Sequence, residues 1–245
     1  MNFPRNIFQI WFVINNSKMS KEWEDAQKTV INLNPNWKYI LVTEDYADNI
    51  VKNFFSNFYQ TYISFPYSIQ KIDAIRYCLL YLYGGIYLDL DYICNKSFDT
   101  LVLKGNEVGL IKSKNLTTYF TNSFIISQKE SQFWLKVINE IQKGIPWFKK
   151  ISKHLNIMNS TGPLMINKMA NKYPNYIQQF NNISVDCNIC KMNNCKIDNN
   201  YYITPIEGKS WNSLDSLILN GIFCNKEIIL IILIILIILI YCKKK

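Results

Sequence analysis

The sequence predicts an α/β fold of Rossmann type, in which an open and mainly parallel sheet is flanked by helices. Short apolar segments rich in β-branched and aromatic residues alternate with segments of helical periodicity along the first half of the chain. Strands that alternate with helices usually pair in parallel, because each helix carries the chain back across one face of the sheet. At 245 residues the chain is long enough to bury a full core.

The first strand is predicted over residues 5–14, RNIFQIWFVI, a short and mainly apolar segment rich in β-branched and aromatic residues. Ser20 is expected to cap a helix that runs to about Leu33, with acidic side chains in its favourable first turn. The Asn-Pro-Asn sequence at 34–36 is expected to end this helix.

A second strand is expected over residues 37–43, WKYILVT, and Asp45 is expected to open a helix that reaches roughly Tyr59. The next helix is expected over residues 68–83, and Gly84-Gly85 terminates it. Its apolar side chains recur at helical spacing and are Ile69, Ile72, Ile75, Leu79 and Leu82.

A third strand, predicted over residues 86–91, carries two carboxylates one residue apart, Asp89 and Asp91. Alternate side chains of a strand leave the same face, so both acids are expected to point the same way. Two like charges this close repel each other unless a cation lies between them. The pair is therefore either solvated at a strand end or holds a divalent metal, and strand ends are where α/β sheets bind ligands.

The second half of the chain shows less regular patterns. A strand is expected over residues 120–127 and a helix from Ser131 to about Lys143, followed by a polar, Asn-rich region. We predict one domain over residues 1–220 and a separate hydrophobic tail over residues 226–245.

Charge and cysteine content restrict the partners. Lysine and arginine total 27 against 18 acidic residues, for a net charge of +9, and arginine occurs only as Arg5 and Arg76. The lysines are scattered, so nucleic acid is not a predicted partner. The seven cysteines are odd in number and irregular in spacing, so free thiols are favoured over a disulfide framework or a zinc site at Cys187, Cys190 and Cys195. The single histidine, His154, is expected to be exposed.

Residues 228–241, IILIILIILIILIY, form an uncharged aliphatic block. As a helix the block would be about 21 Å long, shorter than a hydrocarbon core of roughly 30 Å, although bilayer thinning and snorkelling lysines cover part of the difference. Since the N-terminus shows no signal-sequence pattern, we predict membrane association through a tail anchor, with the folded domain on the cytoplasmic side. The alternative is a low-complexity tract that aggregates or inserts only in part.

Asp73 and Arg76 lie three residues apart on the helix that leads into the acidic strand, so they share a face. A lone arginine in a lysine-rich chain suggests planar, fork-like bonding that lysine cannot reproduce. The alternative is an ordinary surface ion pair. The apolar character of this helix favours the functional interpretation.

At this point the sequence resembles a known family. The segment SIQKIDAIRYCLLYLYGGIYLDLDYI resembles the signature of nucleotide-sugar glycosyltransferases with a DXD-containing sugar-binding region, the family-32 group of initiating α-1,6-mannosyltransferases and inositolphosphoceramide mannosyltransferases. Further segments, NIFQIWF, TNSFIIS, STGP and GKSWN, are similar to other parts of that family and extend the resemblance over about residues 3–215. The residues that fall on the family pattern are Asp73, Arg76, Gly84, Gly85, Tyr87, Asp89 and Asp91.

The resemblance implies a GT-A fold, a nucleoside-diphosphate sugar donor and an Mn²⁺ or Mg²⁺ cofactor. It implies transfer of a hexose to a glycan, lipid or protein acceptor with retention of anomeric configuration. Hard oxygen ligands such as aspartate suit these metals independently of the resemblance. The heavy use of Ile, Asn and Lys is consistent with a giant-virus or protist member.

The resemblance also implies roles for individual residues. Asp89 and Asp91 would bind the metal, while Asp73 would bond sugar hydroxyls beside the charge of Arg76. The remaining donor-binding residues would be Trp11 against the base, Asn122 in the sugar pocket, Ser210 and Trp211 over the diphosphate, and Tyr87 of the family pattern.

Several alternatives remain open. Trp11 fits an apolar core as well as a base platform, and Thr161-Gly162-Pro163 is a turn first and a site second. Many family members carry histidine before the Ser-Trp pair, where this chain has Gly208-Lys209, which leaves a non-catalytic sugar-nucleotide-binding protein as one alternative. A haloacid-dehalogenase-like phosphatase is another, but it requires Thr or Val at the position of Ile93.

Overall fold

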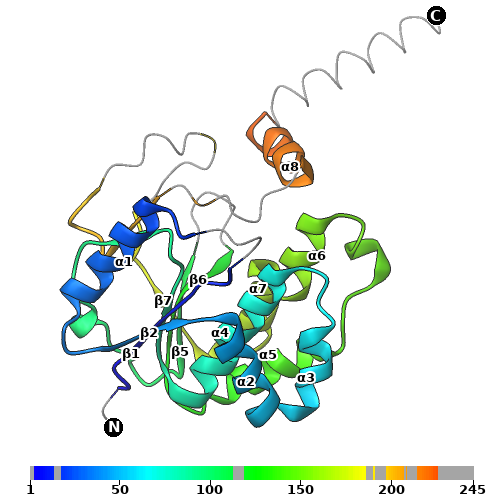
Figure 1. Cartoon of the computed structure of the whole chain (residues 1–245), viewed down its shortest axis with the longest axis horizontal. Coiled ribbons are helices and arrows are strands. Elements are labelled where there is room, and N and C mark those ends of the chain that lie inside the picture. The colour runs from blue at the N-terminus through cyan, green and yellow to red at the C-terminus, as the bar shows by residue number, and fades with distance from the viewer. Residues whose placement is uncertain are drawn as a thin grey trace, which may run out of the picture.

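The computed structural model has a central six-stranded sheet between two layers (Figure 1). It describes residues 3–13, 18–112, 119–185, 190, 197–206, 208 and 214–225. The strand order is β2-β1-β3-β6-β5-β7, and a two-stranded sheet pairs β4 with β8. The strands are β1 Asn6–Ile10, β2 Lys38–Val42, β3 Gly85–Leu88, β4 Tyr92–Cys94, β5 Val108–Lys112, β6 Phe120–Ser127, β7 Ile177–Phe180 and β8 Ile203–Pro205.

Most neighbouring strands of the central sheet are parallel, as the sequence predicts. The parallel pairs are β1–β2, β1–β3 and β5–β7. Strand β6 runs antiparallel to both of its neighbours, β3 and β5. Its first residues therefore lie at the same edge of the sheet as the carboxyl end of β3.

Helices cover one face of the sheet, and a thinner layer covers the other. The helical layer contains α2, α3, α4, α5 and α7, whose apolar side chains pack against Phe8, Tyr87 and Ile125 of the sheet. The opposite layer contains α1 and the β4–β8 sheet, packed against Ile7, Ile86 and Phe124. The helices are α1 Lys21–Leu33, α2 Glu44–Phe54, α3 Ser56–Ile63, α4 Ser68–Tyr83, α5 Gln132–Gln142, α6 Lys153–Ser160, α7 Pro163–Lys172 and α8 Leu214–Cys224, with 3₁₀ turns η1 Phe98–Thr100, η2 Trp147–Lys149 and η3 Pro174–Tyr176.

The start of α1 and both ends of α4 lie where the sequence predicts them. Ser20 caps α1 by accepting a hydrogen bond from the Trp23 backbone N–H, and α4 occupies the whole of residues 68–83. The helix predicted over residues 45–59 is wrong in one respect, because Phe55 has φ −134° and ψ 50° and divides it into α2 and α3. Both α2 and α3 bury apolar side chains in the cluster that contains α4, so the break lets each helix pack against α4.

Two predicted strands end earlier than expected. Strand β1 stops at Ile10 rather than at residue 14, although the Trp11 N–H still donates to the Val42 carbonyl at 2.9 Å. Strand β3 stops at Leu88 rather than at residue 91. The strand over 120–127 and the helix that follows Ser131 are confirmed as β6 and α5.

The cysteine prediction is wrong at one position. Cys190 and Cys224 form a disulfide, with a Cα–Cα distance of 5.7 Å, where the sequence favoured free thiols. Spacing alone did not reveal the pair because 34 residues separate its members. Cys78 and Cys94 are free and buried, while Cys187 and Cys195 lie outside the described residues.

The predicted hydrophobic tail, residues 226–245, also lies outside the described residues. Within the part of the chain that the structure describes, no helix has the length and apolarity needed to cross a bilayer. The tail anchor and the domain boundary therefore stay predictions.

Candidate active site

The two acids of the DXD sequence lie in a turn rather than on a strand. Strand β3 ends at Leu88, and Asp89 and Asp91 belong to the tight connection into β4. The same-face argument for these two side chains is therefore wrong. The Asp89 N–H donates to the Ser123 carbonyl of β6 at 2.9 Å, and the Asp91 carbonyl accepts from the Ile206 N–H at 2.8 Å. The turn is thus fixed by backbone bonds to both sheets.

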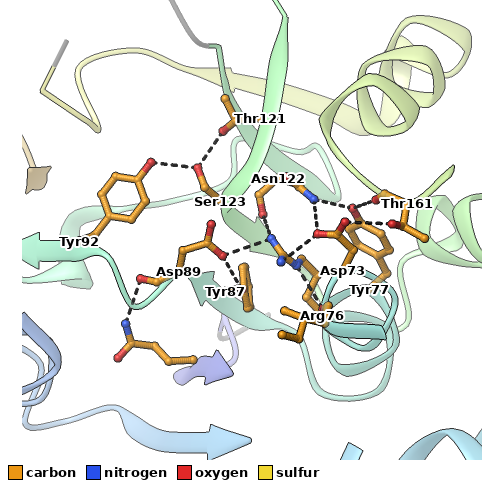
Figure 2. Close-up of polar contacts among 12 residues, drawn as sticks. Asp73, Arg76, Tyr77, Tyr87, Asp89, Tyr92, Thr121, Asn122, Ser123 and Thr161 are labelled. Carbon is orange, nitrogen blue, oxygen red and sulfur yellow. Dashed lines mark hydrogen bonds and ion pairs between the residues drawn. The ribbon is translucent and has the colours of Figure 1, made fainter. Parts of the chain in front are cut away.

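Arg76 lies at the centre of the site and joins three segments of the chain (Figure 2). Its Nη2 is 2.9 Å from Asp73 Oδ1, and its Nη1 is 3.2 Å from Asp89 Oδ1. The same Nη1 donates to the Asn122 carbonyl at 2.7 Å, and the guanidinium lies 4.3 Å from the centre of the Tyr87 ring. Arg76 is only 2% exposed, so the alternative of a surface ion pair is wrong.

Asp73 is buried and bonded through both carboxylate oxygens. Oδ1 accepts from Asn122 Nδ2 at 2.9 Å, and Oδ2 accepts from Thr161 Oγ1 at 2.9 Å (Figure 2). Burial raises the pKa of Asp73 to about 6, although Arg76 and the hydrogen bonds from Thr161 and Asn122 act in the opposite direction. Thr161 therefore fixes a predicted site residue, in addition to lying in a turn.

Asp89 has one occupied and one open oxygen. Its Oδ1 receives hydrogen bonds from Arg76 Nη1 and from the Tyr87 hydroxyl. Among the described residues nothing donates to Oδ2, as Figure 2 shows. The side chain is 32% exposed, so Oδ2 is available to a ligand.

Asp91 Oδ1 is buried, and it has no hydrogen-bond partner among the described residues. Burial, and then the negative charge of Asp89, raise the pKa of Asp91 to about 7. A buried carboxylate oxygen is costly to leave without a partner unless a cation or ligand satisfies it. Within the described ranges, no group of three His, Cys, Asp or Glu side chains is arranged so that it could hold a metal ion. Two carboxylates alone suit a Mg²⁺ or Mn²⁺ ion that keeps its other positions for phosphate and water.

Gly208 closes one side of the acidic turn. A Cβ atom at this position would overlap Asp91 Oδ2, so no side chain fits while Asp91 keeps its orientation. The glycine that stands near the family's histidine is thus matched to the local geometry. Lys209, Ser210 and Trp211 lie outside the described residues.

The structure places Trp11 near the acidic turn and corrects the predicted exposure of His154. Trp11 follows β1 at the edge where Asp89 follows β3, is half-buried, and makes an edge-on contact with Trp23 at 5.8 Å between ring centres. His154 is half-buried rather than exposed, because its Nδ1 lies 3.0 Å from Ser216 Oγ of α8. Burial lowers the pKa of His154.

Sequence reasoning missed several supporting residues. The Tyr77 hydroxyl donates to the Thr161 carbonyl at 2.6 Å and accepts from Asn122 Nδ2 at 3.0 Å. Gln9 Nε2 donates to the Asp89 carbonyl at 3.1 Å. The one available signal was the polar Gln9 within the apolar first strand, where it is fully buried.

A second polar chain runs beside the acidic turn. The hydroxyls of Tyr92 and Ser123 are 3.0 Å apart, and Thr121 Oγ1 is 3.1 Å from Ser123 Oγ (Figure 2). These hydroxyls come from β4 and β6, on the side of the turn away from Arg76. The turn is thus lined by polar groups on both sides.

Comparison with known proteins identifies one region of the chain. Residues 20–109 match the family described as "Glycosyltransferase sugar-binding region containing DXD motif". This part of the chain is thus similar to a DXD-type glycosyltransferase region. Every residue of the acidic turn, together with Asp73 and Arg76, lies within this DXD region.

Curated relatives extend the similarity beyond the DXD region. The chain is 31% identical over 87% of its length to a mannosyl phosphorylinositol ceramide synthase of Saccharomyces cerevisiae, covering 54% of that protein. It is 27% identical over 93% of its length to inositol phosphoceramide mannosyltransferase 2 of Schizosaccharomyces pombe, covering 63% of it. An uncharacterised glycosyltransferase of Acanthamoeba polyphaga mimivirus is 28% identical, with 85% of this chain and 83% of that protein covered. The chain thus spans little more than half the length of the two yeast relatives.

Solved structures support the GT-A-like fold. The glycosyltransferase PaToxG superposes with a TM-score of 0.55 at 18% identity, covering 69% of each chain. The catalytic domain of α-toxin from Clostridium novyi superposes with a TM-score of 0.51 at 11% identity, covering 71% of this chain and 73% of the toxin domain. The predicted α/β class with flanking helices is confirmed at this level.

Proposed function

We propose that the chain is a metal-dependent glycosyltransferase that moves a hexose from a nucleoside-diphosphate sugar to an acceptor. The observation that carries the proposal is the acidic turn, where Asp91 Oδ1 and Asp89 Oδ2 receive no hydrogen bond from any described residue. An Mn²⁺ or Mg²⁺ ion held by these carboxylates supplies charge that stabilises a diphosphate leaving group.

The buried arginine keeps Asp89 in place for this role. Because Arg76 and the Tyr87 hydroxyl both bind Oδ1, the carboxylate is oriented with Oδ2 open. Arg76 is in turn fixed by Asp73 and by the Asn122 carbonyl. Such pre-organisation reduces the reorganisation that the site needs when a donor binds.

The donor-binding roles follow from the same arrangement. We propose that Asp73 accepts hydrogen bonds from sugar hydroxyls through Oδ2, to which only Thr161 donates among the described residues, and that Asn122 lies beside the sugar. We propose that Trp11 stacks on the base, since it follows β1 at the edge of the acidic turn. Ser210 and Trp211 are proposed to cover the diphosphate, and transfer is proposed to retain the anomeric configuration.

A lipid acceptor is favoured by the names of the relatives. Two yeast relatives are named for the mannosylation of inositol phosphoceramide, which suggests mannose as the sugar and a phosphorylated sphingolipid as the acceptor. The aliphatic block at 228–241 is proposed to attach the chain to a membrane. The Cys190–Cys224 disulfide conflicts with the predicted cytoplasmic placement of the folded domain, since disulfides are rare in the cytosol.

The test is donor turnover by the full chain with a panel of nucleotide sugars, with and without Mn²⁺. We expect metal-dependent hydrolysis or transfer from one donor, and Asp91→Asn is expected to abolish it together with Mn²⁺ binding measured by electron paramagnetic resonance. Asp25→Asn, at an exposed acid of α1, is the matched control and is expected to behave as the unmodified chain.

Two results would contradict the proposal. Hydrolysis of a phosphomonoester without any nucleotide sugar would indicate the phosphatase alternative. Binding of Mn²⁺ and a nucleotide sugar without turnover of any donor or acceptor would indicate a non-catalytic binding protein.

A further inference from the structure

An exposed apolar surface lies at the start of α6 and along α8, outside the active site. We call it the docking surface and define it by Trp147, Phe148 and Ile151 before α6, and Leu217, Ile218 and Ile222 on α8. Exposed fractions of these side chains are 77%, 54% and 70% for the first group and 58%, 54% and 50% for the second. Both groups belong to segments that contact α6, η2 before it and α8 beside it. Exposed large apolar side chains concentrated in one region usually mark an interaction site.

Polar contacts with α6 hold α8 in an orientation that leaves its apolar side chains exposed. Asp215 Oδ2 accepts from the His154 N–H at 2.8 Å, and Ser216, which is fully buried, lies 3.0 Å from His154 Nδ1. Asp215 and Ser216 of α8 therefore face α6, and the two helices are in contact. Figure 1 shows α8 above α6. An amphipathic helix on a water-soluble surface normally turns its apolar side inward.

The charge around the part of the docking surface before α6 is positive. Residues 141–185 contain six lysines and no acidic residue. Lys143 and Lys168 are paired with Glu140, but within the described ranges no ion pair involves Lys149 or Lys150, which stand between Phe148 and Ile151. Among the described residues, Lys149 and Lys150 therefore add unpaired positive charge to the apolar group before α6.

This combination selects one class of partner. Exposed Trp, Phe and Ile beside lysine are typical of segments that lie in the interface of an anionic bilayer, where rings enter the headgroup layer and ammonium groups meet lipid phosphates. A second copy of the chain would place lysines against lysines across a two-fold axis, which is unfavourable. The aliphatic block at 228–241 also begins only four residues after α8 ends.

We propose that the docking surface binds the surface of an anionic lipid bilayer. Trp147, Phe148 and Ile151 enter the headgroup layer, Lys149 and Lys150 contact lipid phosphates, and the outer side of α8 lies against the same layer. This binding does not depend on glycosyl transfer. It also differs from the proposed tail attachment, because it uses residues of the folded domain.

The test measures whether Trp147 itself enters the bilayer, so that attachment by the tail cannot produce the result. The full chain is mixed with phosphatidylcholine vesicles that contain about a third phosphatidylserine and brominated acyl chains, which quench nearby tryptophan. We expect quenching that decreases as salt increases. Trp147→Phe is expected to lower the quenched fraction of the emission by about half or more, because Phe keeps the apolar contact but removes the reporter.

A second set of variants distinguishes insertion of the docking surface from non-specific binding through any exposed apolar side chain. Phe148→Ser combined with Ile151→Ser is expected to lower the quenching of Trp147 by a similar amount. Phe54→Ser is the matched control, because Phe54 is 59% exposed at the end of α2 and lies outside the docking surface. It is expected to leave the quenching unchanged.

Three results would overturn the proposal. In the first, Trp147→Phe leaves the quenching of a vesicle-bound chain unchanged. In the second, quenching is equally strong on pure phosphatidylcholine vesicles at all salt concentrations. In the third, sedimentation shows a dimer that the Phe148→Ser and Ile151→Ser changes dissociate, which would assign the docking surface to a second copy.

Discussion

Arg76 shows how much of the site depends on one side chain. It is one of two arginines, it is almost completely buried, and its bonds join α4 to the acidic turn and to β6. A buried charge is tolerated only when its partners are all in place, and the planar guanidinium can satisfy several of them at once.

Replacing this arginine by lysine is therefore a severe change. Arg76→Lys is expected to lower the free energy of unfolding by about 3 kcal/mol and donor turnover by about a hundredfold or more, since an ammonium group cannot replace the fork that orients Asp89. Chemical denaturation and kcat measure the two effects. Arg5→Lys is the matched control, because the Arg5 side chain is 55% exposed and its ion pair with Asp99 is long at 3.8 Å. This variant is expected to change neither the stability nor kcat. Equal effects of both variants would contradict this account of Arg76.

Gly208 offers a sharper test of the acidic turn. Gly208→Ala places a methyl group where Asp91 Oδ2 lies, so Asp91 is expected to rotate and the affinity for Mn²⁺ to fall by about tenfold or more. Gly221→Ala is the control, since a Cβ at 221 meets open space. A variant with alanine at 208 that binds Mn²⁺ normally would show that Asp91 does not hold the metal in this orientation.

The residues that the sequence revealed differ in kind from those it concealed. Asp89, Asp91, Asp73 and Arg76 were visible because charged residues stand out in and after an apolar helix. Tyr77 was not, and Thr161 was visible mainly as part of a turn, because the bond between them spans 84 residues and the Thr161 bond to Asp73 spans 88. The sequence around these two residues carries no signal of such distant partners.

Among the elements, the α4–β3 connection decides how the acidic turn is positioned. Gly84 and Gly85 have φ of 62° and 108°, and a Cβ at Gly85 would overlap the Asn6 carbonyl oxygen. Gly85→Ala is expected to lower the free energy of unfolding by about 3 kcal/mol or more, because both the backbone and the contact with β1 are strained. Urea denaturation measures the change, and a loss below about 1 kcal/mol would contradict it. Gly221→Ala is again the matched control, because a Cβ at 221 meets open space. Gly109 would not serve, because a Cβ there would overlap the Phe180 ring.

The contact between α5 and α7 predicts a pH dependence. Hydrogen bonds from Lys168 and Lys143 lower the pKa of Glu140 to about 2, so the folded state is stabilised above pH 4.5 and loses this stabilisation as the pH falls toward 2. Glu140→Gln is expected to lower the free energy of unfolding by about 1 kcal/mol at pH 7. Denaturation at pH 7, 5, 4 and 3 should show the difference between the two chains shrinking.

The control for this pair is Glu130→Gln, since the bridge between Glu130 and Lys129 is exposed on both sides. It is expected to leave the stability unchanged at each pH. A difference for Glu140→Gln that grows toward acid pH would have the wrong sign.

The bounds of a helix or strand could be predicted where its hydrophobic pattern extends over many residues. Helix α4 is apolar on most sides and ends at two glycines, so its bounds followed from the sequence. Helix α6, KHLNIMNS, and strand β7, IQQF, are short and mixed in polarity, and neither shows a clear period. Their structure depends on tertiary contacts, such as those of Gln70 with Asn156 and Ser160.

At the scale of the whole molecule, the reversed direction of β6 assembles the site. Because β6 is antiparallel to β3, Asn122 and Ser123 at its start meet Asp89 at the end of β3. The sequence predicted the alternation of strands and helices but not this reversal, which two apolar strands of the same type do not distinguish.

The disulfide between Cys190 and Cys224 gives a prediction for the intact chain. Peptide mapping after purification without reductant is expected to show these two cysteines linked. Cys78 and Cys94, which are 0% and 3% exposed, are expected to react with iodoacetamide only after unfolding. Ready alkylation of Cys190 in the folded, unreduced chain would contradict the pairing.

The span of the Arg76 network has a consequence for how the chain reaches its native state. Asp73, Asp89, Asn122 and Thr161 come from segments that are far apart, so their bonds form only when most of the chain has already been synthesised. Until those partners are in place, burial of the guanidinium is costly. We infer that the Arg76 network forms late in folding, so that a partly folded chain lacks the arrangement that orients the two acids.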